Sequence, residues 1–342
     1  AILAQGGLKH SADFFASGPP LGGEVPCGSP AHAGGMGQNC SQECCANGDD
    51  GTNLRIASAP VLTDEKDQLR DPGDQFAQTD DAHRSTSYFD HEAGELGQLK
   101  NAPAIQNGSS YTFKSGATYV GQWKNNVRDG LGKQTWPDGA VYEGEWKNNC
   151  AVGKGRFVHS DGDIFVGQWS KNMASGLGVY YHKGSTTYRG QWRNDLQDGY
   201  GVETCIEGAR YEGQFRDGQK DGVGCYHWID GSVYQGKWCD NVIDGVGLYQ
   251  ASDGRCFKGQ WKESVIHGIG MYVWPGGRAY SGSYLSDQKH GFGVFQWPDG
   301  RKYEGYWVNG RQSGHGRHTT KEGVTRLALW QEGRRVQDLG EA

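Results

Sequence analysis

The stretch YEGEWKNNCAVGKGRFVHSDGDI (142–164) decides the fold, because it recurs along the chain with small changes. Nine copies follow one another every 23 residues without an insertion, from YVGQW (119–123) to YEGYW (303–307). A period of roughly 20 to 50 residues indicates a stacked array in which each unit buries its apolar side against its neighbours. We therefore predict that most of the chain forms one repeat array.

Within one unit the residue pattern predicts a β-hairpin. Aromatic and small residues alternate with polar ones in YEGEW (142–146), which is the period-2 pattern of a strand with one aromatic face. The third residue after the tryptophan of this strand is Asn149, and the equivalent residue in each of the nine units is Asn, Asp, Ser or Gly. These residue types tolerate positive φ in turns. A second strand starts at GKG (153–155), and SDG (160–162) forms the turn to the next unit.

The fold class that follows is all-β: an elongated array of nine 23-residue hairpins that forms a twisted antiparallel ribbon or trough, preceded by a disordered leader. Residues 1–110 contain five aromatic residues and no tryptophan, and they carry 6 Lys/Arg against 15 Asp/Glu. Such a segment cannot bury enough apolar area to offset its conformational entropy. The predicted organisation is an acidic leader over 1–110, an array over 111–336 and a tail over 337–342. Full repeats span 119–325, with a half repeat at each end.

The sequence YEGxW, followed by an Asn or Gly turn, HGxG or DGxG, and PDG, resembles the MORN (membrane occupation and recognition nexus) repeat. The resemblance covers 119–325. Two units depart from it, with Phe215 or Tyr284 in place of tryptophan, and the terminal half unit has Arg326 and Ala328 in place of Tyr and Gly. The resemblance implies an elongated array, often dimeric, that acts as a scaffold or tether at membranes and cytoskeletal structures.

The aromatic face of the ribbon is the predicted partner-binding surface, because an apolar trough that no neighbouring unit covers usually marks a binding site. We expect a protein partner there, and the resemblance implies that this partner is a second copy of the chain. The residues of this face are Tyr119, Trp123, Tyr142, Trp146, Phe165, Trp169, Tyr188, Trp192, Tyr211, Phe215, Tyr234, Trp238, Phe257, Trp261, Tyr280, Tyr284, Tyr303 and Trp307.

Near the N-terminus, MGQNCSQECC (36–45) fits the motif for N-myristoylation if translation starts at Met36, which would make Gly37 the acyl acceptor. One myristoyl chain binds membranes only marginally, so a second lipid is needed for stable anchoring. Cys40, Cys44 and Cys45 are placed to carry palmitate. We therefore expect dual acylation of the leader. If the stretch is instead an internal part of the mature chain, the motif has no function.

Several function classes are disfavoured by the sequence. The GxG sequences recur at hairpin positions and do not open a helix, so they indicate structure and not nucleotide binding. We expect no enzymatic activity, cofactor or metal site. Residues 111–342 carry a net charge of only +3, so no nucleic-acid partner is expected.

The predicted function is thus a non-catalytic scaffold on the cytoplasmic face of a membrane, with lipid contact through the acylated leader. The alternative is a cytoskeletal or axonemal scaffold without membrane contact. A regulatory subunit of a separate enzyme also stays open. The strand face opposite the aromatic residues carries mixed charges, which fit either a solvated surface or contact with lipid headgroups.

Overall fold

The computed structural model describes residues 88–341. These residues include helix α2 (Ala93–Leu99), with further helical residues at 88–90, and they form a 21-stranded antiparallel sheet in which each strand pairs with the next along the chain. The strands are β1 (Ser110–Thr112), β2 (Thr118–Lys124), β3 (Val127–Thr135), β4 (Val141–Lys147), β5 (Cys150–Val158), β6 (Ile164–Ser170), β7 (Met173–Tyr181), β8 (Thr186–Arg193), β9 (Leu196–Cys205), β10 (Arg210–Arg216), β11 (Gln219–His227), β12 (Val233–Cys239), β13 (Val242–Gln250), β14 (Cys256–Lys262), β15 (Val265–Val273), β16 (Ala279–Leu285), β17 (Gln288–Gln296), β18 (Lys302–Val308), β19 (Arg311–Thr319), β20 (Thr325–Gln331) and β21 (Arg334–Glu341).

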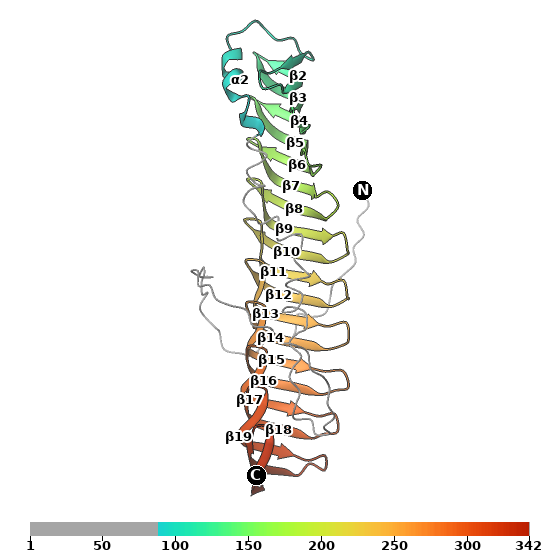
Figure 1. Cartoon of the computed structure of the whole chain (residues 1–342), viewed down its shortest axis with the longest axis vertical. Coiled ribbons are helices and arrows are strands. Elements are labelled where there is room, and N and C mark those ends of the chain that lie inside the picture. Colours follow the sequence, from blue (N-terminus) through green and yellow to red (C-terminus); the bar gives the residue numbers. More distant parts are fainter. Residues whose placement is uncertain (1–87, 342) are drawn as a thin grey trace, which may run out of the picture. The chain divides into compact units, whose positions relative to one another are not determined.

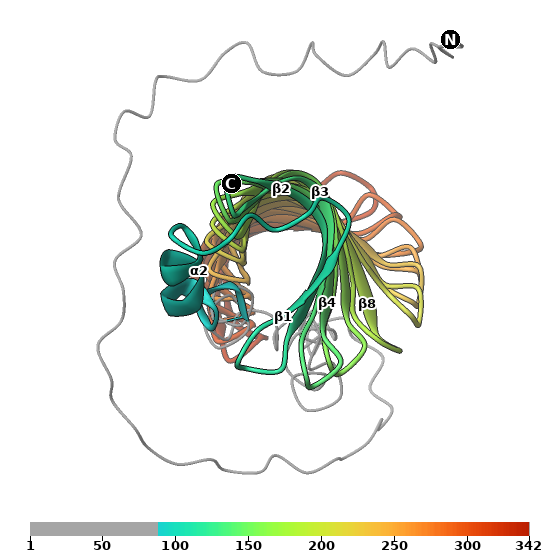
Figure 2. The same ribbon diagram turned by 90° about the horizontal axis from the view of Figure 1, so that it is seen from above.

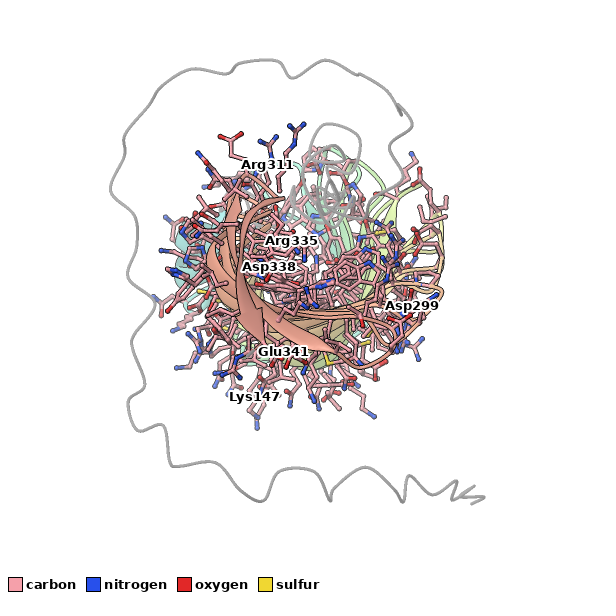
Figure 3. The ribbon with its side chains drawn as sticks, turned by 90° about the horizontal axis from the view of Figure 1, so that it is seen from below. Lys147, Asp299, Arg311, Arg335, Asp338 and Glu341 are labelled. Atoms are coloured by element: carbon pink, nitrogen blue, oxygen red, sulfur yellow. The ribbon has the colours of Figure 1, made fainter. Side chains whose placement is uncertain are left out.

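The strands of the array stack in sequence order along one axis (Figure 1). Seen along this axis, every strand is bent, so the sheet has an inner face on the inside of the curve and an outer face (Figure 2). The hairpin turns and the closing turns lie at opposite edges, as Arg311 and Asp299 show in Figure 3, and Lys147 projects from the outer face. The predicted all-β antiparallel hairpin array is confirmed.

Each hairpin turn is fixed by two residues with positive φ. Lys147 pairs with Cys150, so only Asn148 (φ 49°) and Asn149 (φ 68°) connect β4 to β5. Two-residue turns of this kind match the twist of the flanking strands. The turn has a second role that the sequence pattern did not reveal: Asn149 Oδ1 accepts a 2.7 Å hydrogen bond from the backbone N–H of Arg128 in the preceding hairpin. The turn side chain therefore joins one hairpin to the next.

The bend of each strand arises at a β-bulge beside the glycine pair. Gly121 pairs with Gly132, but Trp123 pairs with Arg128, so residues 129–131 of β3 lie opposite Gln122 alone. Extra residues of this kind bend the strand and increase its twist. The backbone N–H of Leu131 is satisfied by Gln122 Oε1 at 2.8 Å, and glutamines 168, 191, 214 and 260 make the same contact in later hairpins.

The ordered elements extend beyond both ends of the predicted array. Helix α2 and the first residue of strand β1 lie within the predicted leader, and residues 337–341 of the predicted tail belong to β21. The terminal half repeat forms a further hairpin, β20–β21, in which the eight residues of β21 are exposed. Residues 1–87, which contain most of the predicted leader, lie outside the described part of the chain.

Candidate partner-binding face

The eighteen aromatic residues predicted to bind a partner form the core of the array. All of them are buried, and none exposes more than 8% of its surface. The Tyr142 ring lies edge to face with Trp146 at 5.0 Å and with Trp169 of the next repeat at 5.1 Å, and this arrangement repeats along the inner face. The expectation of an exposed trough is therefore wrong for these rings. Because each unit stacks on the next, the rings cover one another, and we call this set the aromatic ladder.

The accessible aromatic surface of the inner face comes from the second strand of each hairpin and from the closing turns. These side chains pack against the ladder but stay half-buried. They include Tyr180, Tyr226, Trp228 and Trp297. The sequence contained the signal, since aromatic residues recur two places after the GxG and in WPDG. That signal indicates packing as readily as binding, so the sequence did not separate the two roles.

A segment of the chain itself occupies the inner face at the first repeats. The Phe89 ring lies 5.3 Å from that of Tyr142, 5.4 Å from that of Trp136 and 5.8 Å from that of Trp169. Leu96 and Leu99 of α2 are buried in the same apolar cluster. Figure 2 shows α2 beside the hairpin edge of the curved sheet. Residues 88–99 thus demonstrate that the inner face accepts a helical segment with apolar anchors.

The same segment brings a carboxylate to a buried cation. Arg128 is fully buried, and its guanidinium carbon lies 4.1 Å from the centre of the Trp146 ring. The guanidinium donates to Gln134 Oε1, and Gln134 Nε2 donates to Glu92 Oε2 at 3.0 Å. Glu92 Oε1 also accepts a 2.7 Å hydrogen bond from Ser115. Burial lowers the pKa of Arg128 to about 10, and the charge of Glu92 opposes this shift.

Position 128 has an equivalent in every repeat. We call these nine equivalent positions the cation column. Its members are Arg128, Ala151, Ala174, Gln197, Lys220, Ile243, Ile266, Lys289 and Gln312. Lys220 of β11 forms an ion pair at 2.8 Å with Glu203 of β9, which lies on the far side of β10, and both side chains are buried. Two of the three cations therefore have a carboxylate near them, as buried charges require.

Lys289 is the third cation, and only 2% of its surface is exposed. Its Nζ lies 4.5 Å from the ring centre of Trp307, 4.6 Å from that of Phe295, and within 6 Å of those of Trp274 and Tyr280. Burial, together with the charge of Arg278, lowers the pKa of Lys289 to about 7. Within residues 88–341 no carboxylate lies at ion-pair distance from Lys289.

The outer face carries an apolar column that the sequence analysis did not identify. The middle residue of each GxG points outward, and seven of the nine are apolar or aromatic and more than half exposed. They are Leu131, Leu177, Tyr200, Val223, Val246, Ile269 and Phe292. Lys154 and His315 occupy the same column. Single exposed apolar side chains are normal on proteins, and here they recur once per repeat with polar residues such as Lys237 and Gln260 paired to them on the adjoining strands.

The described part of the chain holds one group of side chains with the spacing of metal ligands. Asp221, Cys239 and Asp240 hold the one set of three potential ligand atoms within 4.8 Å of one another. Acidic side chains commonly gather at a surface without an ion, so we assign no metal role to them. The proposed acyl acceptors Gly37, Cys40, Cys44 and Cys45 lie outside the described residues.

The hairpin array, its aromatic ladder and the segment docked on its inner face define a protein of the stacked β-repeat class. A model of the MORN repeat matches nine segments: 119–141, 142–164, 165–186, 188–210, 211–233, 234–254, 257–277, 280–300 and 303–325. The chain belongs to the MORN repeat family. A comparison with curated proteins found no matching relative. Within the described residues, no helix is both long enough and apolar enough to cross a membrane.

Among solved structures, the wild-type TCP10 domain of Danio rerio CPAP is similar to this chain, with 15% identity and a TM-score of 0.36 over 61% of this chain and 97% of that one. The G-box domain of the microcephaly protein CPAP matches with 14% identity and a TM-score of 0.34, over 59% of this chain and all of that one. The TCP domain of Drosophila melanogaster SAS-4 matches with 15% identity and a TM-score of 0.29, over 52% and 93%. These similarities are too low to support a functional argument.

Proposed function

We propose that this protein is a non-catalytic scaffold that binds a helical segment of a protein partner on the inner face of its repeat array. The observation that carries the proposal is the chain's own segment 88–99, which is anchored on the inner face through Phe89 and Leu96. Later repeats present the same kind of surface through half-buried Trp228 and Trp297. Helical segments with apolar anchors are a common mode of partner recognition.

Photo-crosslinking in native cells tests this proposal. We expect p-benzoylphenylalanine in place of Trp228, on the inner face, to crosslink to a peptide of another protein with apolar residues three or four positions apart. The matched control carries the same photoreactive residue in place of Tyr200, which is 52% exposed on the outer face. Mass spectrometry identifies the crosslinked peptides. Partner crosslinks from position 200 alone would contradict inner-face binding and support docking on the outer apolar column.

The scaffold is further proposed to be tethered to a membrane by myristoylation of Gly37 and palmitoylation of Cys40, Cys44 or Cys45. The motif MGQNCS (36–41) and the cluster of three cysteines support this proposal. Mass spectrometry of the N-terminal peptide from native cells is expected to show a chain that starts at acylated Gly37. An unmodified chain that retains residues upstream of Met36 would remove the tether and favour a cytoskeletal scaffold without membrane contact.

A further inference from the structure

The pocket around Lys289 is a second version of the pocket around Arg128. The two cations are separated by seven repeats, and the residues around them correspond one to one. Tyr119 corresponds to Tyr280, and Trp146 corresponds to Trp307. Phe113 likewise corresponds to Trp274 in its contact with the cation. Both pockets therefore hold a basic side chain against aromatic rings on the inner face.

The difference between the two pockets lies in the source of negative charge. At Arg128 the docked segment supplies Glu92, which reaches the guanidinium through the amide of Gln134. At Lys289 the residue equivalent to Gln134 is Phe295, so no amide bridges the amine to a carboxylate. The Phe295 ring centre lies 4.6 Å from Nζ and Lys289 is only 2% exposed, so a carboxylate that contacts the amine must displace part of this aromatic cover. Burial without such a partner disfavours the charged form of the amine, and a bound carboxylate would favour that form again.

The rim of the Lys289 pocket adds a second cation without a carboxylate. In the closing turns, Arg255 pairs with Asp253 at 2.7 Å and Arg301 pairs with Asp299 at 2.8 Å, two residues earlier in each case. Arg278 occupies the same position in its turn, but residue 276 is glycine, so this local ion pair cannot form. Arg278 is half-buried and acts electrostatically on Lys289. The two cations together favour an acidic ligand.

From this correspondence we infer that Lys289 and Arg278 receive a carboxylate of a partner protein's helical segment, one that also carries an aromatic side chain three residues before the carboxylate. The spacing is that of Phe89 and Glu92, the pair that fills the first pocket. The inference rests on the proposed inner-face binding and specifies the chemistry of the ligand. The half-buried rings beside the pocket, including Trp297, would contact the aromatic anchor.

A peptide with the sequence of residues 86–105 provides a probe with this chemistry. We expect the labelled peptide to bind the full chain in a fluorescence anisotropy titration, with an affinity that falls about tenfold or more in Lys289→Met, because one charge-assisted contact is worth about 1.5 to 3 kcal/mol. A peptide with Glu92→Gln should lose a similar factor. When the Lys289→Met chain is titrated with the Glu92→Gln peptide, the two losses of affinity should not add, because both substitutions remove the same contact.

Lys262→Met is the matched control, because Lys262 is an exposed cation on the outer face and should leave the affinity unchanged. Lys289→Met places an apolar side chain in an aromatic pocket, and circular dichroism verifies its fold. Equal affinity for wild type and Lys289→Met would overturn the inference and leave inner-face binding intact. Failure of the peptide to bind the wild-type chain would also overturn it, while the crosslinks from position 228 decide inner-face binding independently.

Discussion

Replacing Gly224 with alanine is expected to lower the free energy of unfolding by about 3 kcal/mol, because overpacking a tight core forces strain on both the side chain and the backbone. A Cβ atom at this position would lie 2.3 Å from Tyr211 Oη and 2.4 Å from Tyr211 Cε2. Tyr211 has little room to move. Its hydroxyl donates to the carbonyl of Gln214, and its ring lies 5.1 Å from Phe215 and 5.3 Å from Trp238.

Urea unfolding measures this effect, and hydrogen exchange locates it, because a repeat array opens locally. We expect faster exchange in β10 and β11, with little change in distant repeats. Gly97→Ala is the matched control, since nothing lies within 4 Å of a Cβ there. In helix α2 this change should raise stability by about 0.5 to 1 kcal/mol. A Gly224→Ala protein as stable as wild type would show that the tyrosine rings are not fixed against the glycine pairs.

The local fold could be predicted from the sequence because each hairpin repeats the same short-range rules. The alternation of aromatic and small residues with polar ones predicted the strands. Turn residues such as Asn149 and Gly162, which have positive φ in the structure, predicted both turns. Contacts between hairpins were harder to predict. The hydrogen bond from Arg128 N–H to the Asn149 side chain joins residues 21 positions apart, and nothing in one unit indicates it. The contact of Gln122 with Leu131 lies within one hairpin, but it depends on the register shift beside the glycine pair, which residue alternation does not indicate.

The candidate site was predicted only in part, because burial depends on the stacking of units. The sequence identified the aromatic residues of the inner face, yet it could not show that Tyr142 and its equivalents are covered by the next repeat. The cation column escaped notice because its members vary in type from Ala to Arg. Lys220 and Lys289 look alike in the sequence, and only the position of Glu203 distinguishes them. Polar residues at variable core positions therefore require the structure.

Replacing Glu92 with alanine is expected to cost about 3 to 5 kcal/mol at the first repeats, which is typical when one partner of a buried charge pair is removed. Glu92 is 1% exposed and is the acidic group of the network that contains Arg128 and Gln134. Without it, the buried guanidinium loses the charge that compensates its desolvation. We expect residues 88–99 to detach in part, with faster hydrogen exchange in β2 and β3 and a lower urea midpoint.

Glu95→Ala is the matched control in the same segment. Glu95 also accepts two hydrogen bonds, from Tyr111 Oη and Lys114 N–H at 2.8 Å each, but it is only half-buried and its loss should cost about 1 kcal/mol. Adding Arg128→Met to Glu92→Ala should restore most of the stability, because an apolar side chain needs no counter-charge. Equal losses for Glu92→Ala and Glu95→Ala would mean that the array tolerates an unpaired buried cation at Arg128. In that case Lys289 would need no carboxylate either, so this comparison also tests the premise of the second pocket.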